Sequence, residues 1–467
     1  MRPVLLLAAA ALAGCALKTP PTHTAIVQQA LPADTRVPPA WRAAALGGDV
    51  SNDWLKSFDD PVLERLVAEA IAHNPDLRAA ATQVAIAQQA VVVVGSRLQP
   101  WVGAQLGATA TQDQDNGGHS NSTAFLGVAW ELDVWGRLRA QRAASEANAE
   151  AVALDYAYAR QSLAATTAKL WYLAVEARQI VLLNQRSVAI YGDLLSLVQV
   201  RRDAGKDSDL DVVDVRAKLE TAQSETARAQ QALGEAQRGL EVLLGRYPAA
   251  EIEVAAVYPA LPPLPGSGVP SSLLERRPDL LAAEREVLVA FRREEAAQLA
   301  LLPEFSLSLA GGRLGDQVLS LLQLNPWLAS AGIGVSIPIY EGGALQAKVE
   351  IATAQQLQAV ARYGAVVLTA FREVENSLAN ERLLALQLPL DQKAAADRGE
   401  AVRIATIQYK AGRRDLLWVA QLQTAQLGTE ATLIKLRALQ RANRVQLVQA
   451  LGGSFDAQPP TATGIVR

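Results

Sequence analysis

Few side chains in this 467-residue sequence could carry out chemistry. There is one cysteine, and the three histidines are scattered along the chain, which leaves little for a metal cluster. The segment DSDLD at 207–211 has the acidic spacing that opens a calcium loop. However, Val212 and Lys218 stand where an EF-hand needs glycine and glutamate. No nucleophile–base pair is recognisable. We therefore expect no enzyme, no metal site and no cofactor.

The single cysteine, Cys15, follows a short apolar run near the N-terminus. One positive charge and roughly ten apolar residues, too few to span a bilayer, are typical of a secretory signal peptide. Residues 12–15, LAGC, resemble the bacterial lipobox, whose cysteine is acylated and becomes the mature N-terminus. In that class an aspartate after the cysteine commonly marks retention in the inner membrane. This chain has Ala16 at that position, which favours the outer membrane. The alternative is an ordinary signal peptide beside an incidental cysteine.

Composition excludes several classes of partner and favours long helices. The net charge is −3, so no basic surface for nucleic acid is expected. Half of the residues are apolar, much of that alanine, and only 5% are aromatic, which suits closely packed helices. After Cys15 no uninterrupted apolar run approaches 18 residues, so we expect no transmembrane helix.

The chain repeats itself after about 200 residues. NPDLRAA at 74–80 recurs as RPDLLAA at 277–283, and GVAWELDVWGRLRA at 127–140 aligns with GVSIPIYEGGALQA at 334–347. A proline-rich linker separates the copies. The predicted segments are a signal peptide 1–14, a lipidated N-terminal segment 15–52, a first repeat 53–256, the linker 257–272, a second repeat 273–452 and a flexible tail 453–467.

Within each copy the apolar pattern changes its period. After a helical stretch that begins at Pro75, the period becomes two from Trp101 onward, and the second copy does the same from Phe305. Four strands of about ten residues have the length and alternation of an outer-membrane barrel. The alternative is a hairpin or sandwich packed on a soluble helical bundle.

Each hairpin of strands is followed by a very long helical stretch, Arg137–Asp203 in the first copy and Ala344–Lys410 in the second. Each stretch ends near a glycine, Gly205 or Gly412, that can cap a helix and turn the chain. The returning helix has apolar residues at 3-4 spacing from Val212 onward, which indicates coiled-coil packing.

Four strands cannot close a membrane barrel, because bacterial barrels need about eight and an open edge in lipid leaves backbone groups unpaired. An oligomer must close the sheet, with 8 strands from a dimer, 12 from a trimer or 16 from a tetramer. A barrel that continues into long helices would form a conduit.

The lipobox, the duplicated hairpins, NPDLRAA, LLERRPDLLAAE and the two AG turns together resemble the TolC-like outer-membrane efflux proteins, in particular their lipid-anchored NodT-type branch. The resemblance implies a mostly α fold with a β-barrel part. It implies a homotrimer with a 12-stranded outer-membrane barrel and a periplasmic α-helical barrel. An equatorial layer would draw on the N-terminal, linker and C-terminal segments. A periplasmic adaptor, or membrane fusion protein, and an inner-membrane transporter would complete a tripartite pump.

The resemblance also assigns roles to the helical tips. Tyr409 and Arg414 match a tyrosine and an arginine that hold the periplasmic iris closed. The family often places pore-constricting aspartates where this chain has Trp418 and Gln421, and their first-copy counterparts are Asp211 and Asp214. We predict that these two aspartates form a ring that favours cations. The expected adaptor contacts are Ala204, Gly205, Lys206, Ala411, Gly412 and Arg413. Two solvated turns of mixed charge are the alternative.

The function expected from the resemblance is a passive export duct for small molecules or drugs, lipid-anchored in the outer membrane, reaching into the periplasm and gated at the helical tips. One alternative is a periplasmic coiled-coil scaffold or adaptor lipoprotein. Another is the same duct serving protein secretion or metal-ion efflux.

Overall fold

The computed structural model describes residues 17–44, 47–113, 117–315 and 328–456. The contacts of the chain group into two units. Unit 1 comprises 1–35, 82–155 and 279–366, and unit 2 comprises 36–81, 156–278 and 367–467. Cys15 and the predicted signal peptide lie outside the described residues, as does most of the predicted tail.

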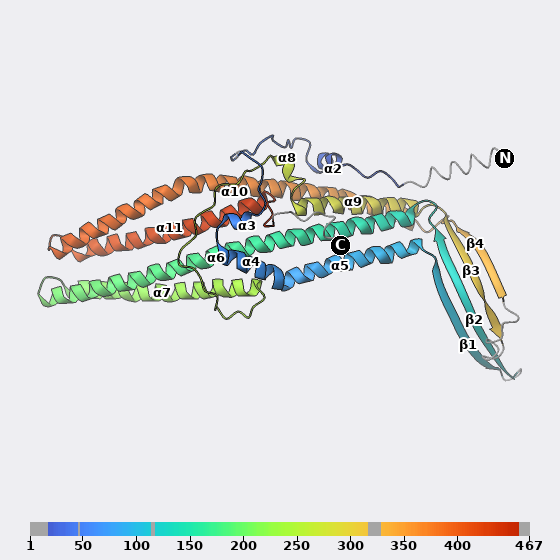
Figure 1. The fold of residues 1–467 in the computed structure, drawn as a ribbon, viewed down its shortest axis with the longest axis horizontal. Coiled ribbons are helices and arrows are strands. Elements are labelled where there is room, and N and C mark those ends of the chain that lie inside the picture. Colours follow the sequence, from blue (N-terminus) through green and yellow to red (C-terminus); the bar gives the residue numbers. More distant parts are fainter. Residues whose placement is uncertain (1–16, 45–46, 114–116, 316–327, 457–467) are drawn as a thin grey trace. The chain divides into compact units, whose positions relative to one another are not determined.

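A helix, two strands, a very long helix and a returning helix follow one another twice along the chain (Figure 1). An N-terminal helix, α2 (His23–Ala30), precedes both copies. The first copy contains α3 (Trp54–Ser57), α4 (Pro61–His73), α5 (Pro75–Gly95), η1 (Ser96–Leu98), β1 (Trp101–Asp113), β2 (Gly117–Leu132), α6 (Arg137–Asp203) and α7 (Asp209–Leu243). The second contains α8 (Pro270–Leu273), α9 (Pro278–Leu299), β3 (Glu304–Gly315), β4 (Leu328–Ser336), α10 (Ala344–Lys410) and α11 (Leu416–Ala450). The predicted internal repeat is confirmed.

The four strands form one antiparallel sheet in the order β1-β2-β3-β4 (Figure 1). Cross-strand partners in an antiparallel sheet share a face. The pairs Val102↔Val128, Val128↔Leu309 and Leu307↔Ile333 therefore place the apolar residues of all four strands on one face. The other face carries small and polar residues such as Gly127 and Ser308. The predicted alternation is confirmed, and the apolar face is exposed, since Ile333 is 78% accessible.

The two longest helices have the predicted bounds, Arg137–Asp203 and Ala344–Lys410. Both end at a glycine with positive φ, +66° at Gly205 and +71° at Gly412, where a side chain would be strained. At the first turn Gly205 and the next residue donate to carbonyls of the last turn of α6, which satisfies groups that the helix end leaves free. Each long helix then reverses into a 35-residue partner, α7 or α11.

Unit 2 is held together by two apolar clusters. One surrounds Trp171 and Tyr172 of α6, where α4 and the ends of α7 and α11 meet. Trp171 Nε1 donates a 2.8 Å hydrogen bond to Asp60, the residue that also caps α4. The second cluster lies near the helical turns and contains buried residues of α6, α7, α10 and α11. The residues that α7 contributes follow its coiled-coil spacing, because Val212, Val215 and later seam positions are buried.

Among the helices that the structure describes, one stretch, Pro75–Leu98, is long and apolar enough to cross a membrane, by length and composition alone. This differs from our expectation, which required an uninterrupted apolar run, whereas Gln83, Gln88 and Gln89 interrupt this one. Helices that pack inside bundles can also be this long and this apolar. The stretch is therefore weak support for a membrane span.

Candidate functional site: the tips of the helical hairpins

The predicted tip residues lie on two turns at one end of unit 2, between α6 and α7 and between α10 and α11 (Figure 1). The six residues expected to contact an adaptor are all exposed on these turns. The two turns are not independent, because side chains of the last residues before each turn meet.

Three side chains form this link: Arg201 at the end of α6, Asp207 in the first turn and Tyr409 at the end of α10. Arg201 Nε donates a 2.9 Å hydrogen bond to Asp207 Oδ2, and the Tyr409 hydroxyl donates to the same oxygen. The Arg201 guanidinium also lies over the Tyr409 ring, 4.4 Å from its centroid. We call Arg201, Asp207 and Tyr409 the tip latch.

The tip latch is largely shielded from solvent. Tyr409 is 1% exposed and the Asp207 side chain 8%. Burial opposes ionisation of Asp207, but hydrogen bonds from Arg201 and Tyr409 and the charge of Arg201 outweigh it and lower the pKa of this carboxyl. Burial and the hydrogen bond to Asp207 raise the pKa of Tyr409, which stays a neutral donor. A charged acceptor with a neutral phenol donor makes a strong, directional bond.

Arg414 does not share in this latch. Its guanidinium lies 5.5 Å from the ring centroid of Trp418, one turn further along the same hairpin. Of the two residues assigned to holding the iris, Tyr409 thus reaches the other hairpin and Arg414 contacts its own. The gate role of Arg414 remains a prediction.

The two predicted gate aspartates have partners within α7. Asp211 completes a capping box with Ser208, whose backbone N–H and hydroxyl donate to the Asp211 carboxylate at 2.8 and 2.6 Å. Asp214 forms an ion pair with Lys218, 2.6 Å apart at i, i+4. Asp211 therefore stabilises the start of α7, and the charge of Asp214 is balanced locally.

Sequence reasoning missed Arg201 and Asp207. A signal was available, because the repeat offset of 207 aligns Asp207 with Arg414, so the two copies carry opposite charges at this position. Among the described residues no group of three or more His, Cys, Asp or Glu could hold a metal ion.

A four-stranded sheet with an exposed apolar face, joined to two long antiparallel helical hairpins, defines the protomer of an outer-membrane duct. The comparisons agree, because the model of the outer membrane efflux protein family matches residues 66–246 and 269–453. The chain belongs to this family, and it is an outer-membrane channel component of an efflux system.

Relatives of similar length extend this result. The pyoverdine export outer membrane protein OpmQ of Pseudomonas putida is 29% identical over 96% of this chain and 97% of its own. The toluene efflux pump outer membrane protein TtgC of the same species is 29% identical over 96% of this chain and 94% of its own. Among solved structures, the outer-membrane channel OprN is 27% identical, with a TM-score of 0.82 over 91% of this chain and 99% of its own.

Proposed function

We propose that three copies of this chain close a 12-stranded barrel in the outer membrane and form a passive duct for small molecules. The observation that carries the proposal is the sheet. Its apolar face is exposed, and among the described residues the outer edges of β1 and β4 have no strand beside them. A sheet in lipid cannot leave edge groups unpaired, so further copies must supply the neighbouring strands.

The duct has a lipid anchor at Cys15 and an equatorial layer built from segments that cross the helices. The resemblance of LAGC to a lipobox supports the anchor. For the layer, the support is that the indole nitrogen of Trp41 donates to the carbonyl of Ser267 at 2.9 Å. Arg441 likewise donates to the carbonyl of Pro259 at 2.7 Å. The first contact joins the N-terminal segment to the linker, and the second joins the linker to α11, all within unit 2.

The exposed tips meet a periplasmic adaptor, and an inner-membrane transporter supplies the energy. The tip latch joins the two hairpins of each chain and keeps the periplasmic end narrow, with Arg414, Asp211 and Asp214 near the constriction. The chain itself performs no catalysis. The cargo belongs to the broad class of small molecules to which pyoverdine and toluene, named for the relatives, belong.

Planar-bilayer recordings of the purified full-length protein test the proposal. We expect discrete conductance steps, and native mass spectrometry should show trimers. A periplasmic scaffold would give no conductance, and another stoichiometry with conductance would overturn the trimer alone. Cross-linking from Lys206→Cys or Arg413→Cys in cells should capture an adaptor, whereas capture only from an exposed site far from the tips would contradict docking there.

A further inference from the structure

The hairpin formed by α10 and α11 is fixed at one level by a buried polar cluster. Arg444 of α11 donates to both carboxylate oxygens of Glu381 in α10, at 3.2 and 3.0 Å. Asn443 adds hydrogen bonds to Glu381 and to the carbonyl of Ser377, and Arg444 also donates to the carbonyl of Pro262 in the linker. The paired side chains are only 4% and 6% exposed. Separating a buried ion pair is strongly unfavourable, so this level is rigid.

Between this cluster and the tip, α10 contains a proline, Pro389. Proline has no N–H to donate to the carbonyl of Ala385, and its ring crowds that carbonyl, so the hydrogen-bond ladder of α10 is interrupted there. The repeat offset of 207 aligns Pro389 with Leu182 of α6, where the backbone hydrogen bond is available. The first copy thus lacks the weak point that the second has.

Packing shows the same difference between the copies. From Pro389 to Ile404 no residue of α10 is buried against its own chain. The matching part of α6 has a buried residue in each turn, among them Leu183, Ser187 and Tyr191. Packed side chains resist bending, so contacts within the chain support α6 at this level and give α10 no such support, where its hydrogen-bond ladder is also interrupted.

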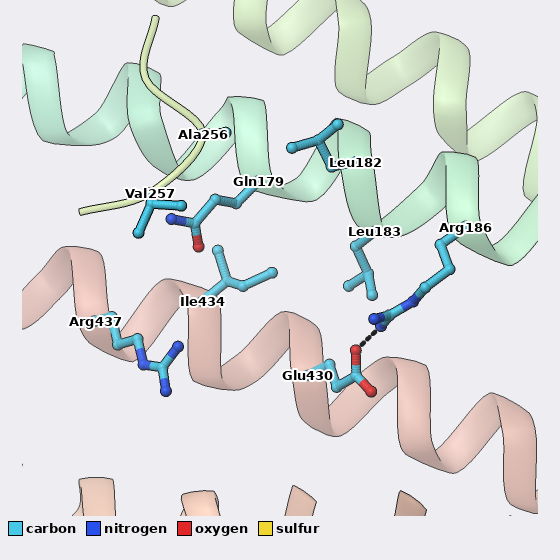
Figure 2. A pocket seen from close by; sticks show the side chains of 9 residues that line it. All are labelled: Gln179, Leu182, Leu183, Arg186, Ala256, Val257, Glu430, Ile434 and Arg437. Atoms are coloured by element: carbon cyan, nitrogen blue, oxygen red, sulfur yellow. Dashed lines mark ion pairs between the residues drawn. The ribbon is translucent and has the colours of Figure 1, made fainter.

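A groove lies beside α11 at the same level. It has a volume of about 420 Å³ between α6 and α11, with Leu182 and Ile434 among its lining residues (Figure 2). Two contacts set the register of α10 against α11: the Glu381–Arg444 pair and the 3.1 Å hydrogen bond from Arg398 to the carbonyl of Ala425. This register places Pro389 opposite residues 434–436. The Arg186–Glu430 ion pair, drawn dashed in Figure 2, bridges the groove. Two residues before Glu430, Gly428 weakens α11, because glycine is unfavourable inside a helix.

We infer that Pro389 is the hinge that positions the gate: the tip half of the α10–α11 hairpin swings about it while α6 and α7 stay straight. This inference rests on the proposed gating of the duct at the helical tips. The buried Glu381–Arg444 cluster holds the fixed end of the hairpin, and the groove gives α11 room to shift toward α6. The bond from Arg398 to α11 makes the two helices move together. The tip latch holds the free end.

Distances between spin labels at the tips test the hinge. Arg413→Cys is exposed, and Cys15 is the chain's only native cysteine, so mass spectrometry can verify one label per chain. Four labelled full-length proteins are compared in lipid nanodiscs: the parent, Tyr409→Phe, Pro389→Leu and the double variant. Leu390→Ala with Tyr409→Phe is the matched control, because Leu390 is the exposed neighbour of the proline.

We expect Tyr409→Phe to lengthen the label distances, Pro389→Leu to remove most of that lengthening in the double variant, and Leu390→Ala to leave it intact. Hydrogen exchange over 385–395 should slow in Pro389→Leu with an unchanged or higher melting temperature. If the double variant opens as far as Tyr409→Phe, the hinge is wrong while the gate stands. If Tyr409→Phe moves nothing, gate and hinge both fail, and unchanged exchange shows that α10 was never weak at Pro389.

Discussion

The hydroxyl of Tyr409, at the end of α10, donates a hydrogen bond to the carboxylate of Asp207, in the turn that follows α6. The two residues are 202 positions apart and belong to different copies of the internal repeat. Arg201 donates to the same oxygen, so any separation of the two hairpins at this level must part a phenol from a shielded carboxylate. The relationship makes the resting position of one hairpin depend on the other.

Removing the phenol hydroxyl should make the tips open more readily. A hydrogen bond to a charged group contributes about 1.5–3 kcal/mol, which corresponds to roughly a 10- to 150-fold shift per protomer toward the open state in Tyr409→Phe. Single-channel open probability measures the shift. Lys206→Ala, an exposed change beside Asp207 on the same turn, serves as the control and should leave it unchanged. Equal open probabilities in Tyr409→Phe and the parent would remove the latch from the mechanism.

The latch should be insensitive to pH across the neutral range. The pKa of Asp207 is lowered in the latched state. The stability that its carboxylate gives the latch is therefore complete above the pKa of a free carboxyl, about 3.9, and is lost as pH falls below that value. The pKa of Tyr409 is raised. The stability that its hydroxyl gives the latch is therefore complete below the pKa of a free phenol, about 10, and is lost as pH rises above that value. Open probability should stay flat from pH 5 to 8, rise below about pH 4, and lose the acid response in Asp207→Asn. A transition between pH 5 and 7 in the parent would assign gating to another group.

Ion selectivity should follow the charges near the start of α7. Lys218 balances Asp214, so Lys218→Ala should increase cation selectivity, and Asp214→Asn, which leaves Lys218 unbalanced, should decrease it. Replacing both Asp211 and Asp214 with alanine should weaken cation selectivity and block by polyvalent cations. Alanine at 211 also removes a helix cap, at a cost of about 0.5–2 kcal/mol, so Asp211→Asn, which can still cap, is the matched variant. Reversal potentials in a salt gradient measure these effects, and unchanged potentials in all variants would place the aspartates away from the lumen.

The fold was accessible from the sequence where its signal is periodic. The bounds of α6 and α10 follow from a helical pattern that ends at a glycine turn, and the apolar face of the sheet follows from strict alternation. The pairing of Asp214 with Lys218 and the capping box of Asp211 were also readable, since both are local patterns.

The tip latch could not be predicted in the same way. It requires α6 and α10 to end at the same level and to turn Arg201 and Tyr409 toward each other, and both depend on packing between helices far apart in sequence. A buried charged pair leaves no periodic trace. Only the opposite charges of Asp207 and Arg414 at aligned positions indicated that the two turns differ.

Lipid at Cys15 should aid insertion without being required for it. In unit 1 the described chain already holds its N-terminal segment, because the Lys18 backbone N–H donates to Glu295 of α9 at 2.5 Å and its carbonyl accepts from Arg292 at 2.9 Å. A Cys15→Ala form with a cleavable signal should therefore still reach the outer membrane as trimers, with reduced yield. Membrane fractionation and native mass spectrometry measure this. Glu295→Ala in the lipidated protein is the complementary control, since it loosens the segment and keeps the lipid. Purely soluble monomer from Cys15→Ala would show that the strands alone do not insert, and would favour a lipid-anchored scaffold over a duct.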